Sequence, residues 1–153
     1  MLPFRNILSP TDFSEPSYKA IKVANELALH FSARLVLLHV VSLTPIVAVS
    51  ATDPTVLDVD SYQKELEEDA RRQMKQIVDI MISRDIKVFV PMITSGSYPM
   101  EILRIAREEN SDLIVIGTRG RTGISHLVLG SVAERVVQLA TCPVLTIGPT
   151  INV

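Results

Sequence analysis

The chain has 153 residues, 47% of them hydrophobic and 21% charged, which is typical of one globular domain over residues 1–153 and excludes a disordered chain. The net charge of −2 excludes a global attraction to nucleic acid or to an acidic membrane. The single cysteine, Cys142, permits no internal disulfide, and the chain has neither a signal-peptide pattern nor a run of ~20 apolar residues, so we expect a cytoplasmic protein.

The N-terminal half predicts two strands, each followed by a helix. The first strand, Arg5–Ser9, precedes a helix that Ser14 and Pro16 open. The second strand, Leu35–Val41, is followed by the irregular segment Ser42–Asp60, which we interpret as a mobile surface loop or lid. Apolar residues then recur at helical spacing at Tyr62, Leu66, Ala70, Met74, Ile77 and Met81.

The C-terminal half continues the alternation of strand and helix. Strands are predicted at Lys87–Ile93, Asp112–Ile116 and Val144–Ile147, and helices over Met100–Asn110 and from Ser131 onward. The residues expected to face inward on these two helices are Ile102, Leu103, Ala106, Val132, Val136 and Leu139. Five strands separated by four helices predict an α/β fold with three layers, in which a parallel, Rossmann-like sheet has helices on both faces.

Two polar clusters come directly after predicted strands. Ser9–Asp12 (SPTD) follows the first strand, and the glycine-rich stretch 117–131 follows the fourth. In an open parallel sheet, ligands bind beyond the carboxyl ends of the strands, where neighbouring crossovers diverge. If the first and fourth strands are neighbours, both clusters face one crevice.

The stretch GTRGRTGISHLVLGS (117–131) contains four of the six glycines. Glycines let a ligand approach the backbone, and Ser131 is placed to cap a helix whose N-terminus would favour phosphate. Arg119 and Arg121 can add charge-assisted contacts. The alternative is a flexible connection with surface arginines. The stretch is neither a Walker A loop, since the chain has no Gly-Lys pair, nor a G-x-G-x-x-G dinucleotide fingerprint.

Asp12 has two interpretations. Its carboxylate would repel phosphates, so as a ligand-binding group it would accept hydrogen bonds from ribose hydroxyls or an adenine amine. Alternatively, it serves the turn and helix start in the run DFSEP, which is a common use of aspartate. The presence of the glycine-rich stretch favours the first interpretation.

Gly117, Gly120 and the pair Gly130–Ser131 follow a long spaced pattern: G-x-x-G, nine residues, then G-[ST]. With this motif the chain resembles the universal stress protein family, in which the pattern binds a nucleotide. The resemblance extends to ILSPTDFS at the start, LLHV and DLIVIG in the second and fourth strands, and CPVL at the fifth. The turn SGSYPME before the third helix is a residue longer than the family's common G-x-P form.

The resemblance implies a five-stranded parallel sheet in the order 3-2-1-4-5, which makes the first and fourth strands neighbours. It also implies an ATP-binding regulator of the stress response that forms a homodimer through the fifth strand, Val144–Ile147. Asp12 would hold the ribose or adenine, with Pro10 and Thr11 shaping that wall and Val40 presenting backbone groups to the adenine. The glycine motif begins at Gly117, and its phosphate-binding groups would be the Ser131 hydroxyl and the amides of Thr118, Arg119, Gly120, Gly130, Ser131 and Val132.

The sequence offers no convincing catalytic set. The three histidines, His30, His39 and His126, form no metal-ligand pattern, and we expect His39, inside an apolar strand, to be a satisfied core residue. A divalent metal, Mg²⁺ or Mn²⁺, would be carried on the phosphates without protein ligands of its own. We therefore expect little or no turnover; the alternatives are a dimeric interaction protein with a vestigial nucleotide site and a slow ATP-using enzyme.

Overall fold

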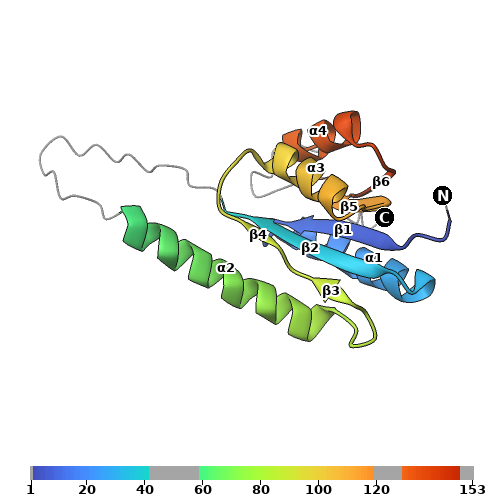
Figure 1. Ribbon diagram of the computed structural model, residues 1–153, viewed down its shortest axis with the longest axis horizontal. Helices are drawn as coiled ribbons and strands as arrows, with labels where there is room; N and C mark the ends of the chain where they lie inside the picture. The colour runs from blue at the N-terminus through green and yellow to red at the C-terminus, as the bar shows by residue number, and fades with distance from the viewer. Residues whose placement is uncertain (1, 42–58, 119–128, 149–153) are drawn as a thin grey trace, which may run out of the picture.

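The computed structural model of the chain describes residues 2–41, 59–118 and 129–148 (Figure 1). Strands and helices alternate as the sequence predicts. The strands are β1 (Asn6–Thr11), β2 (Arg34–Val40), β3 (Val88–Phe89), β4 (Met92–Ile93), β5 (Leu113–Gly117) and β6 (Val144–Ile147). The helices are α1 (Glu15–Phe31), α2 (Val59–Met81), α3 (Tyr98–Glu108) and α4 (Ser131–Leu139).

All strand pairs are parallel, and the order is β3-β2-β1-β5-β6, with β4 also paired to β2. The predicted parallel sheet and its order are therefore confirmed, and β1 lies beside β5. The prediction of one strand over Lys87–Ile93 is wrong in one respect, because the segment is divided into β3, which begins opposite Leu35, and β4, which begins opposite His39. Pro91 lies between the two pieces and has no amide hydrogen to donate, so the ladder is interrupted there.

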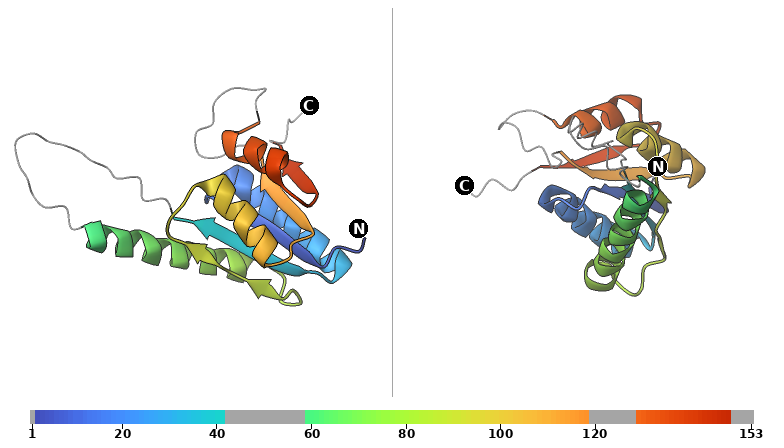
Figure 2. Two further views of the ribbon diagram at one scale, coloured as in Figure 1. Left: turned by 45° about the horizontal axis from the view of Figure 1, so that its top comes forward. Right: turned by 90° about the vertical axis from the view of Figure 1, so that its left-hand side faces the viewer.

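Helices cover both faces of the sheet. α1 and α2 pack against one face, and α3 and α4 pack against the other (Figure 2, right). Successive side chains of β1 point to opposite faces, so Ile7 belongs to the α1–α2 core and Leu8 to the α3–α4 core. Because both faces are buried, the central strands are continuous apolar runs in the sequence.

The helix ends confirm one prediction and correct three others. Ser14 caps α1 as predicted, and its side chain accepts a hydrogen bond from the first turn. Gly130, not Ser131, is the N-cap of α4, because helical geometry begins at Ser131. Tyr62 and Leu139 were predicted on the apolar faces of their helices but are exposed. Tyr62 is 44% exposed, since the first turns of α2 extend past the sheet (Figure 1), and Leu139, in the last turn of α4, is 37% exposed.

Among the described residues, no helix combines the length and apolarity needed to cross a membrane.

Candidate functional site

A cavity of about 400 Å³ lies at the carboxyl ends of β1, β2 and β5, where the parallel-sheet rule predicts a ligand site. The first turns of α3 and α4 form its other side. It brings together nine of the eleven residues selected from the sequence: Pro10, Thr11, Asp12, Val40, Gly117, Thr118, Gly130, Ser131 and Val132. The other two, Arg119 and Gly120, lie outside the described residues, as do His126 and the predicted loop up to residue 58.

Six further lining residues are not predicted from the sequence, namely Ser17, Leu38, Tyr98, Ile102, Ile116 and Ala133. The aliphatic members of this set have the spacing of core residues, and spacing alone does not separate a ligand-facing wall from a packed core. Tyr98 has a signal in the sequence, because it stands in the turn SGSYPME, which is a residue longer than the common form in the family that the sequence resembles.

The strand order divides the cavity into two chemically different ends. Because β1 lies between β2 and β5, Asp12 lies between the two ends. The apolar end, on the β2 side, is formed by Leu38, Val40, Tyr98 and Ile102. The polar end, on the β5 side, is formed by Thr118, Gly130, Ser131, Val132 and Ala133.

Asp12 takes part in the turn that joins β1 to α1. Its Oδ1 atom accepts a hydrogen bond of 3.0 Å from the Ser14 amide and a second from the Ser14 hydroxyl. The turn role predicted as the alternative for Asp12 is therefore present in the structure. Asp12 also lines the cavity, so its role in the turn does not exclude contact with a ligand.

Hydrogen bonds beneath Asp12 fix the end of β1. The hydroxyls of Thr11 and Ser17 are 2.9 Å apart, and the Phe13 amide donates to the Thr11 hydroxyl at 3.0 Å. His39 Nδ1 lies 2.9 Å from the Thr11 carbonyl oxygen, and the His39 ring is tilted against Phe13 with centroids 4.2 Å apart. The expected hydrogen bond of His39 is thus confirmed, although its ring is half-buried rather than fully buried.

Two of the amides expected to hold phosphates are engaged within the protein. The Thr118 amide donates to the Ile147 carbonyl at 2.9 Å, and the Gly130 amide donates to the Thr118 carbonyl at 2.6 Å. These bonds tie the end of β5 to β6 and to the start of α4. The first intrahelical bond of α4 comes from the Glu134 amide to the Gly130 carbonyl at 2.8 Å, so the amides of residues 131–133 have no intrahelical acceptor and are available to an anion.

Gly117, the first glycine of the motif, has a packing role. A Cβ atom at this position would lie 2.9 Å from the carbonyl oxygen of Pro16 and 3.3 Å from the amide nitrogen of Ser17. Both atoms belong to the backbone of the first turn of α1, which approaches β5 closely here. Glycine is therefore required at position 117 by the contact between helix and strand, irrespective of any ligand.

The described cavity lining supplies three kinds of contact. The apolar end supplies hydrophobic area, the polar end supplies amide donors, and Asp12 supplies a carboxylate acceptor between them. Among the described lining residues, Asp12 is the only acidic side chain, and no histidine, lysine or arginine lines the cavity. This arrangement suits a ligand with an apolar part, hydroxyl or amine donors in the middle, and an anionic group at the far end.

The model of the universal stress protein family matches residues 3–148. The chain belongs to the universal stress protein family.

Relatives of this universal stress protein match it over nearly its full length. Universal stress protein MJ0531 of Methanocaldococcus jannaschii is 34% identical over 144 residues, which are 94% of this chain and 82% of that protein. The solved structure of protein MJ0577 from the same organism has a TM-score of 0.81 at 29% identity and covers 97% of this chain and 99% of that one. A universal stress protein of Archaeoglobus fulgidus, solved in complex with dAMP, shares the fold at 20% identity, with a TM-score of 0.66 and coverage of 96% and 99%.

Proposed function

We propose that the cavity binds an adenine nucleotide, ATP in the first instance, and that the protein is a regulator or sensor in a stress response with little or no turnover. The observation that carries this proposal is the polarity of the cavity, with an apolar end, an aspartate held by Ser14, and an end where the amides of residues 131–133 have no intrahelical acceptor. The cavity volume of about 400 Å³ is in the range of small-molecule sites. The dAMP complex of the relative from Archaeoglobus fulgidus is a further argument for this ligand class.

The proposed orientation follows from the two ends. The base lies at the apolar end, the sugar lies by Asp12, and the phosphates lie at the first turn of α4. Asp12 accepts hydrogen bonds from donors such as sugar hydroxyls, and a carboxylate next to the phosphates would be repulsive. The amides of residues 131–133 and the positive end of the α4 dipole favour the phosphates. Mg²⁺ or Mn²⁺ would be carried on the phosphates rather than by dedicated protein ligands.

The expectation of little turnover rests on the position of Asp12. A general base for phosphoryl transfer has to lie within hydrogen-bond reach of the attacking group. Asp12 lies between the two ends, and its Oδ1 atom is already occupied by two hydrogen bonds from Ser14. In this proposal the energy of nucleotide binding changes the protein's conformation or its contacts instead of driving repeated chemistry.

We also propose that two copies pair along β6. Among the described strands, β6 is at the edge of the sheet and pairs with β5 alone, and its Leu145 is 38% exposed. An unpaired edge is a template for another strand. Sedimentation equilibrium of the purified protein is expected to give the mass of two chains, and a mass near the 16.9 kDa of one chain at micromolar concentration would contradict pairing.

Calorimetric titration of the purified protein with ATP, ADP, AMP and cyclic AMP tests the proposed ligand class. We expect saturable binding of at least one of these ligands, and mass spectrometry of the native protein would also detect a nucleotide that co-purifies. Absence of binding to all four would favour a vestigial site in an interaction protein. Steady hydrolysis of ATP near ~1 s⁻¹, the low end for ordinary enzymes, would contradict the regulatory role and favour an enzyme.

A further inference from the structure

Tyr98 is the one aromatic residue in the described cavity lining, and it lies at the apolar end. It is the first residue of α3 and is 40% exposed. Among the described residues, its ring has no aromatic partner and its hydroxyl has no hydrogen-bond partner. A large ring at the edge of an apolar wall therefore has contact area that the fold itself does not use.

The turn that precedes Tyr98 is fixed by packing. Gly96 has φ +106°, a backbone conformation that favours glycine. A Cβ atom there would lie 2.7 Å from Oε1 and 2.8 Å from Cγ of Glu101, which shows that the Glu101 side chain lies back over the turn. The Ser97 carbonyl accepts the Glu101 amide at 3.0 Å, and Pro99 restricts the backbone in the first turn of α3.

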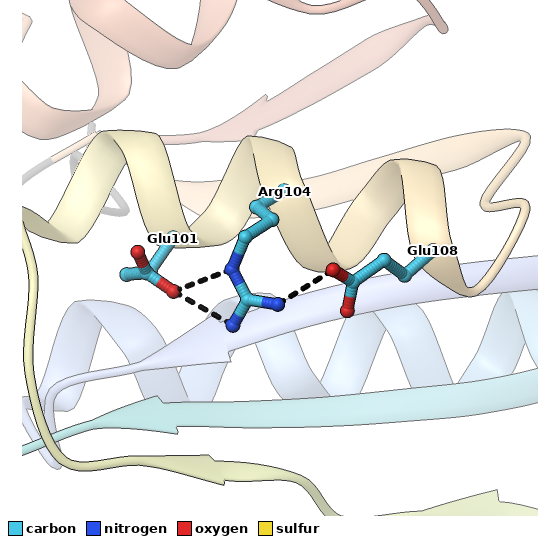
Figure 3. Close-up of polar contacts among 3 residues, drawn as sticks. All are labelled: Glu101, Arg104 and Glu108. Carbon is cyan, nitrogen blue, oxygen red and sulfur yellow. Dashed lines mark hydrogen bonds and ion pairs between the residues drawn. The ribbon is translucent and has the colours of Figure 1, made fainter.

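An ion-pair network holds Glu101 over this turn (Figure 3). Arg104 Nε donates to Glu101 Oε2 at 2.8 Å, and Arg104 Nη1 donates to Glu108 Oε1 at 2.6 Å. The Glu101 side chain is 18% exposed, whereas that of Arg104 is 43% exposed. The hydrogen bond to Glu101, followed by that to Glu108, raises the pKa of the Arg104 guanidinium, which stays charged at neutral pH. The network thus keeps the Glu101 side chain over the turn that precedes Tyr98.

We propose that Tyr98 covers the base of the bound nucleotide and makes the site favour purines over pyrimidines. This inference rests on the proposed function, because it takes the apolar end as the base-binding end. Aromatic rings pack well on the flat faces of bases, and a tyrosine loses little conformational freedom in doing so. The two fused rings of a purine offer more area to Tyr98 than the single ring of a pyrimidine.

The first experiment compares nucleotide affinities of the full chain and of two Tyr98 variants by calorimetry. Tyr98→Ala is expected to weaken ATP binding roughly 5- to 150-fold, the range for loss of one base–aromatic contact, and to weaken CTP binding less. Tyr98→Phe keeps the ring and should bind ATP within about 3-fold of the wild type. The ratio of ATP to CTP affinity should therefore fall in Tyr98→Ala and persist in Tyr98→Phe, a pattern that general loosening of the cavity does not produce.

The second experiment uses the absence of tryptophan from the chain. Tyr98→Trp places the only tryptophan of the variant at the apolar end, and the tryptophan emission should be quenched saturably as ATP binds. Tyr62→Trp is the matched control, because Tyr62 is 44% exposed and lies on α2, away from the residues that line the cavity. Its emission should not respond to ATP.

The outcomes separate this inference from the proposed function. A wild-type protein that binds none of the adenine nucleotides overturns the proposed function and the role of Tyr98 with it. A wild type that binds ATP, together with a Tyr98→Ala variant of equal affinity, overturns the role of Tyr98 alone. So does calorimetric binding of ATP to Tyr98→Trp without any change in emission, or an equal loss of ATP and CTP affinity in Tyr98→Ala. Circular dichroism and thermal unfolding of each variant verify that it is folded.

Discussion

The two ends of the cavity are built from different parts of the protein. At the apolar end, the aliphatic wall residues Leu38, Val40 and Ile102 are also members of the core between the sheet and the α3–α4 layer. At the polar end, the groups available to a ligand are main-chain amides at the start of α4, where Ser131 is exposed and Val132 is half-buried. One end is therefore a surface of the hydrophobic core, and the other is the end of a helix.

This difference has consequences for mutation. A change in the aliphatic wall alters the core and the ligand contact together, so stability and binding should fall together. A change at the start of α4 alters access to backbone donors without removing packed side chains, so binding should fall while stability is maintained.

Ile102→Ala is expected to have the largest effect, because Ile102 is 3% exposed and faces both the core and the cavity. Removing a buried isoleucine side chain to Cβ lowers the free energy of unfolding by about 2–5 kcal/mol. Urea denaturation measures this loss. Ile80→Ala is the matched control, because Ile80 is 81% exposed on α2, and its stability should stay within about 0.5 kcal/mol of the wild type.

Nucleotide affinity in Ile102→Ala, measured in the same buffer by calorimetry, should also fall, because the apolar wall recedes. Unchanged affinity alongside lost stability would mean that the base does not lie at the apolar end. In that case the apolar end would still be part of the hydrophobic core, but it would not be the end that binds the base.

Gly117→Ala tests whether the β5 side of the cavity, unlike the start of α4, contributes to packing. The added Cβ atom would lie 2.9 Å from the Pro16 carbonyl oxygen, and both partners are backbone, so α1 or β5 has to shift. Overpacking of this kind lowers the free energy of unfolding by about 1–3 kcal/mol. Gly148→Ala is the control, since a Cβ atom there would be 4.0 Å from its nearest neighbour.

Equal stability of Gly117→Ala and Gly148→Ala would mean that the first motif glycine serves the ligand alone. The expected difference instead places Gly117 with the core residues, although it belongs to the polar side of the cavity. Two glycines of one motif would then have different roles, because Gly117 would serve the packing of α1 on β5 and Gly130 would serve ligand binding.

Much of the fold was predictable from local patterns. Apolar runs and helical spacing locate every strand and helix within a few residues, because each element buries a face in one of two cores. The family resemblance adds the strand order, which periodicity alone does not determine. The division between β3 and β4 was also accessible in principle, since Pro91 is visible in the sequence.

Nine of the cavity-lining residues were selected from the sequence, but the hydrogen bonds around them were not predictable. Motif spacing selects Gly117, Thr118, Gly130 and Ser131, which all line the cavity. It does not reveal that the amide of Thr118 donates to Ile147, because that bond depends on where β6 ends. Nor does it reveal the packing of α1 on Gly117. Contacts between segments distant in sequence decide which backbone groups remain available.

Gly130→Val is expected to have the smallest effect on stability and a clear effect on binding. Gly130 has φ −61° and ψ 145°, an extended conformation that valine adopts without strain. The substitution also leaves its amide free to donate to the Thr118 carbonyl, so α4 should start at the same residue. The branched side chain should nevertheless restrict access to the amides of residues 131–133, because Gly130 lines the cavity next to them.

ATP affinity of Gly130→Val should fall by at least about ten-fold, the equivalent of one hydrogen bond to a charged group at about 1.5–3 kcal/mol. Gly148→Val provides the control, because position 148 does not line the cavity. If Gly130→Val binds ATP as the wild type does, the phosphates do not lie against α4. If Gly130→Val loses as much stability as Ile102→Ala does, the start of α4 is part of the packed core. The two ends of the cavity would then contribute to stability in similar ways.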